Sequence, residues 1–213
     1  MSDDPFNTPV VRHSPSTGAG SPDVWGIYEP DTGSIQYICA DPATKKAALI
    51  DVVWNFAPKN YRFSTESMEL VMDLVAEHGL EVQWVLDTHP HADHVMASAH
   101  LKERTGAPNA IGALVPDIAQ IWADLYNLHD VFDPARDFDG TDDRDTPQWE
   151  ATVAEHKANN IHVKDGTKRE DYIQRRQERD ATLALPDRIL AALQINLRGG
   201  RLPPAEDDGG HYL

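Results

Sequence analysis

The chain has 213 residues, of which 40% are hydrophobic and 25% charged, a balance typical of a water-soluble globular domain with one core. No apolar run approaches the roughly 20 residues of a membrane span, and the segment Met1–Pro5 lacks the features of a secretory signal. The formal charge of −16 disfavours binding to nucleic acids and anionic lipids, and the single Cys39 excludes an internal disulfide. We therefore expect a cytoplasmic protein that binds neither nucleic acid nor membranes.

The first part of the chain predicts an arm followed by an antiparallel or mixed sheet. Residues 1–22 are rich in Ser, Thr, Pro, Gly and Asp, which indicates a flexible arm. Three strand patterns follow, at 24–28, 34–40 and 46–53. The segments between them carry turn residues such as Pro, Asp, Thr and Gly. Short turns join antiparallel neighbours, so the pattern predicts two consecutive hairpins.

Helix and strand patterns alternate in the next part. A helical stripe of apolar residues begins after Ser64 or Thr65, either of which can cap the helix, and Gly79 ends it. The predicted elements that follow are a short apolar strand at 82–86, a helix at 95–105, a strand at 110–112 and a helix at 115–126.

The last third is predicted to be helical. Residues 129–148 are acidic and poor in apolar side chains, which is typical of a loop. Capping signals then predict three helices, at 146–159, 167–184 and 186–195. The segment 202–210 is rich in Pro, Gly and Asp and is expected to be irregular.

One short segment carries most of the chemical information. His89, His91, Asp93 and His94 are four potential ligands within six residues, at the end of a predicted strand. Alternate residues of an extended stretch point the same way, so His89 and His91 can reach one ion, and a following turn brings Asp93 and His94 close. Imidazole and carboxylate ligands suit zinc, iron or manganese. The sequence therefore predicts a metal site at these four residues.

This motif, preceded by a strand and an amphipathic helix, resembles the metallo-β-lactamase fold superfamily. Further segments are similar to its persulfide dioxygenase (sulfur dioxygenase) branch: 28–37, 48–51, 64–67 and a C-terminal block that includes 193–198 and 200–207. The resemblance covers nearly all of residues 22–213. It implies an α/β (α+β) fold, an αββα sandwich of two mixed sheets with helices outside, incomplete here and with a helical C-terminal part.

The sequence departs from the family pattern after the first motif. The family continues with a His in an HTPGHT-like loop, an Asp in a GDTLF-like strand end and a His in an HDY-like loop, and none of these strings occurs here. The chain resembles a single domain, 23–213, that lacks an internal block with the join near residues 141–144. In persulfide dioxygenases the first His of the motif, the HTPGHT His and the bridging Asp hold iron, so only His89 carries over. The other three residues of the motif bind metal in dizinc relatives.

The resemblance implies a mononuclear Fe(II) enzyme that oxidises glutathione persulfide to sulfite with O₂. The implied partner is a small-molecule thiol or persulfide, and a homodimer is compatible with this reading. One alternative is a zinc-dependent hydrolase of the glyoxalase II or lactonase type, in which Asp93 and His94 bind a second ion. Another alternative is a non-catalytic deletion product that keeps the outer parts of the fold without a working site.

Overall fold

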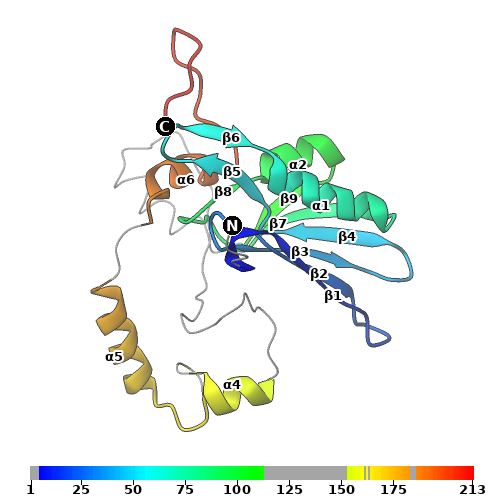
Figure 1. Ribbon diagram of the computed structural model, residues 1–213, viewed down its shortest axis with the longest axis vertical. Helices are drawn as coiled ribbons and strands as arrows, with labels where there is room; N and C mark the ends of the chain where they lie inside the picture. The colour runs from blue at the N-terminus through cyan, green and yellow to red at the C-terminus, as the bar shows by residue number, and fades with distance from the viewer. Residues whose placement is uncertain (1–4, 113–152, 161, 163, 183–185) are drawn as a thin grey trace. The chain divides into compact units, whose positions relative to one another are not determined.

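The computed structural model describes residues 5–112, 153–160, 162, 164–182 and 186–213 (Figure 1). The chain divides into two units. The first unit, residues 1–147 with 187–213, contains both sheets, and the second unit spans 148–186. The helix predicted at 115–126 and the loop predicted at 129–148 lie outside the described residues.

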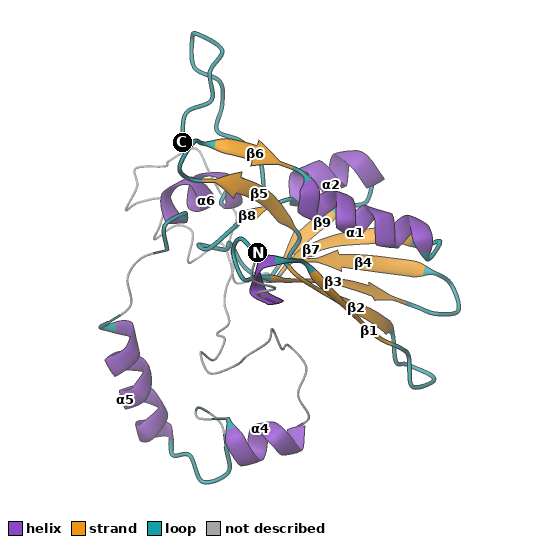
Figure 2. Cartoon of the chain, viewed as in Figure 1, coloured by secondary structure: helices purple, strands orange, loops and turns teal. Residues whose placement is uncertain are grey.

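The first unit contains a six-stranded mixed sheet, ordered β1-β2-β3-β4-β7-β9 (Figure 2). Its strands are Val10–Ser14 (β1), Asp23–Tyr28 (β2), Ile35–Ala40 (β3), Lys46–Ile50 (β4), Glu81–Asp87 (β7) and Asn109–Ile111 (β9). The strands β1 to β4 pair antiparallel, which confirms the two predicted hairpins. The strands β7 and β9 run parallel to their neighbours β4 and β7.

The strand β1 lies within the segment 1–22, which the composition predicts as a flexible arm. It pairs with β2 along its whole length, from Val10 opposite Tyr28 to Ser14 opposite Val24. Its first two residues are β-branched valines, which favour a strand. The ladder of backbone hydrogen bonds to β2 supplies the order that the composition of the surrounding segment does not predict.

A second, three-stranded sheet has the order β6-β5-β8, with strands Val53–Ala57 (β5), Arg62–Ser64 (β6) and Val95–Met96 (β8). Two sequence predictions are corrected here. The strand predicted at 46–53 is two strands, because Asp51 has a positive φ of 54° and turns the chain from β4 into β5. The helix predicted at 95–105 begins only at Ser98, because Val95 and Met96 pair with β5 instead.

Three α-helices lie in the described part of the first unit: Glu66–Glu77 (α1), Ser98–Thr105 (α2) and Ile189–Asn196 (α6). Alternate strand residues such as Ile38, Leu49 and Val85 form one core cluster with Val71 of α1 and Leu101 of α2. Each of these side chains is almost fully buried. Burying a side chain of this size contributes about 1.5–3 kcal/mol, so this cluster holds α1 and α2 against the larger sheet.

The second unit contributes two helices to the described residues, Val153–Asn159 (α4) and Arg169–Asp180 (α5). Neither helix has a buried residue. They lie within the helices predicted at 146–159 and 167–184, which confirms the helical character of this part. None of the helices in the described residues is long and apolar enough to cross a lipid bilayer.

Candidate metal centre

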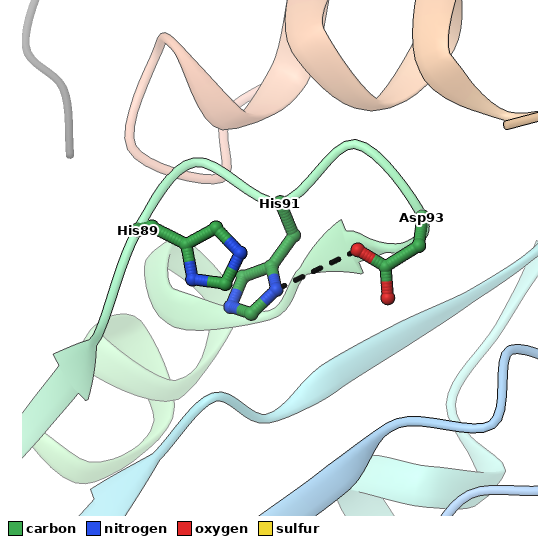
Figure 3. Close-up of side chains that lie close together, drawn as sticks. All are labelled: His89, His91 and Asp93. Atoms are coloured by element: carbon green, nitrogen blue, oxygen red, sulfur yellow. Dashed lines mark ion pairs between the residues drawn. The ribbon is translucent and has the colours of Figure 1, made fainter. Parts of the chain in front are cut away.

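The loop between β7 and β8, residues 88–94, carries all four predicted ligands and is called the ligand loop below. Its residues His89, His91 and Asp93 each offer one ligand atom, and these atoms lie within 4.8 Å of one another (Figure 3). The imidazole rings of His89 and His91 are tilted by 43° relative to one another, with centroids 3.7 Å apart. The ligand loop thus brings two imidazoles and one carboxylate to a single point.

The fourth predicted ligand, His94, lies next to this cluster and outside it. Its ring centroid is 3.9 Å from that of His91, and its Nδ1 lies 3.2 Å from Asp93 Oδ2. The side chain is only 1% exposed. Among the described residues, no hydrogen-bond partner faces its buried Nε2. A buried imidazole nitrogen without a partner is costly, and a bound cation is one way to satisfy it.

Asp51 holds the start of the ligand loop in place. It follows β4 directly, and its carboxylate accepts hydrogen bonds from the Thr88 backbone N–H at 2.7 Å and the Thr88 hydroxyl at 2.8 Å. Its own N–H donates to the Leu86 carbonyl at 2.9 Å. Asp51 Oδ1 also lies 3.1 Å from His91 Nε2, an ion pair without the angles of a hydrogen bond. Asp51 therefore orients both the backbone and one imidazole of the site.

A second polar network approaches the loop from the turn between β2 and β3. The Ser34 hydroxyl lies 3.1 Å from Asp93 Oδ2 and 2.9 Å from His94 Nδ1. The Thr32 hydroxyl lies 2.8 Å from the Ser34 hydroxyl and 2.5 Å from a carboxylate oxygen of Glu29. Glu29 is only 2% exposed, so this chain of hydrogen bonds connects a buried carboxyl group to the edge of the cluster.

The charges of the site favour a cation. Burial lowers the pKa of His91, but the carboxylates of Asp51 and Asp93 outweigh it and raise this pKa to about 9. Burial raises the pKa of Asp93, but the two neighbouring imidazoles outweigh it and hold the pKa well below its usual range. Burial and the nearby His91 lower the pKa of His94. The anionic surroundings therefore hold positive charge at His91, which a divalent cation can replace.

The residues present fit a transition-metal ion. The donor set of two imidazoles and one carboxylate is suitable for zinc, iron or manganese. His94 Nε2, which has no hydrogen-bond partner among the described residues, offers a fourth donor atom nearby. A metal is therefore indicated, and its identity is not fixed by these donors. Sequence patterns did not single out Asp51, Ser34 or Glu29, whose side chains are held near the ligand loop by contacts between distant segments.

Asp51→Asn tests this orienting role. The variant keeps the shape and, since Asn tolerates a positive φ, the backbone turn. It removes the negative charge beside His91 and one acceptor for Thr88. We expect an affinity for Zn²⁺ that is about 10- to 100-fold lower, the usual cost of losing a group that orients a ligand. Competition with a chromophoric chelator measures it, and Asp73→Asn, on an exposed position of α1, is the control. Equal affinities in the two variants would contradict the assignment.

Comparisons with known proteins place the fold and the family. The family model described as "Metallo-beta-lactamase superfamily" matches residues 30–161. The crystal structure of ETHE1 from Myxococcus xanthus matches the described fold with a TM-score of 0.57 and 20% sequence identity, and the match covers 90% of this chain and all of that one. This likeness confirms the predicted fold class.

Curated relatives carry different functional names. A "Beta-lactamase hydrolase-like protein" from Agrobacterium fabrum is 32% identical over 92% of this chain. "Glyoxylase B2" from Dictyostelium discoideum is 27% identical over 90% of this chain and 94% of its own length. "Persulfide dioxygenase ETHE1, mitochondrial" from Bos taurus is 32% identical, but over only 43% of this chain and 32% of its own length.

The chain is shorter than the relatives with which it aligns. It spans 64% of the length of the Agrobacterium protein. The alignment between them runs over 279 positions, whereas this chain has 213 residues, so the relative contains internal residues without a counterpart here. The family model covers more than half of the chain, from the turn after β2 through the ligand loop and beyond. The chain belongs to the metallo-beta-lactamase superfamily.

Proposed function

We propose that the chain binds one ferrous ion through His89, His91 and Asp93 and acts as a persulfide dioxygenase on glutathione persulfide. The observation that carries this proposal is the donor set: two imidazoles and one carboxylate, with ligand atoms within 4.8 Å of one another. Such a set with open positions is typical of non-haem Fe(II) oxygenases. The fold of ETHE1 and the partial similarity to a protein named persulfide dioxygenase support the same assignment.

The reaction must balance in sulfur, oxygen and electrons. One glutathione persulfide, one O₂ and one water give one glutathione, one sulfite and two protons, so the terminal sulfur is oxidised and O₂ is reduced. A bound ferrous ion would supply Lewis acidity and electrons for this chemistry. The chain's own residues orient the ligands: Asp51 fixes His91, and Ser34 fixes Asp93.

The absence of the later family motifs limits the affinity of this site for iron. The sequence lacks the later HTPGHT-like, GDTLF-like and HDY-like ligand strings, and the long alignment with the Agrobacterium protein supports the absence of an internal block. A site that has lost outer ligands loses part of its preorganisation. We therefore expect weaker iron binding and slower turnover than in relatives that have the full ligand set.

Oxygen consumption tests the proposal. The protein is loaded with Fe(II) without oxygen, freed of excess iron and mixed with glutathione persulfide and O₂. We expect O₂ uptake with sulfite formed in equal amount, and no uptake by the His89→Ala variant treated in the same way. If wild type and variant consume O₂ at the same rate, the dioxygenase assignment is wrong.

A specific observation favours one alternative, a zinc-dependent hydrolase of the glyoxalase II or lactonase type. His94 has a buried Nε2 without a described partner and adjoins Asp93, so the two residues could hold a second ion. The names of the Agrobacterium and Dictyostelium relatives point the same way. Metal analysis separates the readings: one iron per chain favours the dioxygenase, and two zinc ions with thiolester hydrolysis favour the hydrolase. An ion bound with neither activity would favour the non-catalytic deletion product.

A further inference from the structure

The last residue of α6, Asn196, makes three hydrogen bonds to the chain around the ligand loop. Its Nδ2 donates to the backbone carbonyls of His91 and His94, both at 2.7 Å. Its Oδ1 accepts from the Met96 N–H at 2.8 Å. The partners are about 100 residues away in the sequence, and Asn196 is 0% exposed.

These three bonds use both N–H donors of the side-chain amide and its oxygen acceptor. The ligand loop belongs to no helix or strand, so its backbone geometry depends on bonds from other segments. The two carbonyls that Asn196 binds belong to His91, a residue of the cluster, and to His94 beside it. A buried amide with these partners fixes the backbone from which the imidazoles project.

Gly200 provides an independent observation at the same junction. It has a positive φ of 82°, and a Cβ added there would lie 2.9 Å from the Met96 carbonyl oxygen and 3.0 Å from the Ala99 nitrogen. The chain therefore passes the β8–α2 junction too closely for any side chain. Gly199 lies between Asn196 and Gly200 in the sequence, and its carbonyl accepts a hydrogen bond from the Ser98 hydroxyl at 3.4 Å.

We propose that Asn196 and Gly200 form a backbone clamp that positions the ligand loop for metal binding. Asn196 holds the loop through its amide, and Gly200 allows the C-terminal segment to lie directly against β8 and α2. This proposal rests on the proposed function, because it assumes that the ligand loop holds a metal ion. Both residues act through the loop backbone and neither is assigned as a ligand.

The test compares variants that break the clamp with one that only weakens the core. Asn196→Ala removes all three bonds, and Asn196→Asp keeps the shape but replaces both donors by an oxygen that faces two carbonyls. We expect Co²⁺ affinity to fall about 10- to 100-fold in both variants, with a changed visible absorption spectrum of the bound Co²⁺. Leu197→Ala is the matched control, since Leu197 is equally buried and its side chain has no hydrogen bond to lose. This control should lower the melting temperature without changing the affinity or the spectrum.

Gly200→Ala tests the clamp without touching Asn196, and it serves if the Asn196 variants do not fold. The added methyl must displace the β8–α2 junction, so we expect Co²⁺ affinity to fall about tenfold. Unchanged affinity and an unchanged Co²⁺ spectrum in the folded clamp variants would overturn the proposal. The proposal would also be overturned if Leu197→Ala lost as much Co²⁺ affinity as the clamp variants do.

Hydrogen exchange of the metal-free protein separates this proposal from the proposed function. Exchange at the Met96 amide should accelerate in Asn196→Ala, and should accelerate less in Leu197→Ala at equal global stability. If the wild type binds no ion, the proposed function fails, and the exchange experiment still decides whether Asn196 holds β8 at the end of the ligand loop. Equal exchange at Met96 in the two variants would show that it does not.

Discussion

Replacing His89 by alanine is expected to lower the affinity for a transition-metal ion by about 100-fold or more, beyond the usual effect of losing an orienting group. His89 is one of only three residues whose ligand atoms converge in the described cluster. It is partly exposed, so its removal leaves no large cavity in the core. The variant should therefore fold normally and fail to retain metal. Metal content after gel filtration and a chelator competition measure the loss, with circular dichroism as the check on folding.

His156→Ala is the matched control for this prediction. His156 lies on α4 in the second unit, is exposed, and accepts or donates one hydrogen bond with Asn160 at 3.0 Å. Its removal should leave metal affinity unchanged. If His156→Ala lost metal and His89→Ala retained it, the ligand loop would not be the metal site, and a residue of the second unit would take its place.

Replacing Asp87 by asparagine is expected to stabilise the metal-free protein at neutral and alkaline pH. Asp87 ends β7, and burial, with the nearby charge of Asp51, raises its pKa to about 7. The folded protein therefore holds the proton more tightly than the unfolded chain does. This contribution to stability is fully present below about pH 4 and is lost as the pH rises to about 7. The full loss of stability corresponds to about 4 kcal/mol. Asparagine does not ionise, so the variant does not undergo this loss as the pH rises.

Urea unfolding of wild type and Asp87→Asn between pH 4 and 8, with a chelator present, measures this difference. The difference in free energy of unfolding should grow in favour of the variant as the pH rises, and level off above about pH 7. Asp73→Asn, at an exposed position of α1, should follow the wild-type curve. A constant offset between Asp87→Asn and wild type over the whole range would show that the carboxyl of Asp87 does not titrate in this interval.

The ligand cluster was predictable because it is local. His89, His91 and Asp93 follow one another at alternate positions after a buried strand, and the connectivity of the chain alone keeps them within reach of one ion. The hairpins of β2, β3 and β4 and the helix α1 were predictable for a similar reason, since turn residues and apolar periodicity act over a few neighbouring positions. The persulfide substrate, the homodimer and the cytoplasmic location stay predictions.

The residues that orient the cluster were not predictable in this way. Asp51 binds Thr88 across 37 positions, Ser34 reaches His94 across 60, and Asn196 reaches His91 across 105. Each is an ordinary polar residue in its own segment, and its role exists only once β4, the β2–β3 turn and α6 meet the ligand loop. The break between β4 and β5 was not predictable for the same reason. The apolar run at 46–53 favours one continuous strand, whereas the structure has a turn at Asp51, where this residue makes hydrogen bonds with the distant Leu86 and Thr88.

The sequence by itself thus determined which side chains are candidate metal ligands, since four such residues within six positions need no tertiary contact to lie near one another. Only the tertiary structure decided which of them converge, leaving His94 beside the cluster, and which distant groups hold them there. The physical reason is that coordination needs fixed directions as well as short distances. A loop without secondary structure obtains fixed directions from contacts with other parts of the fold, here the hydrogen bonds of Asp51 and Asn196 and the ion pair between Asp51 and His91.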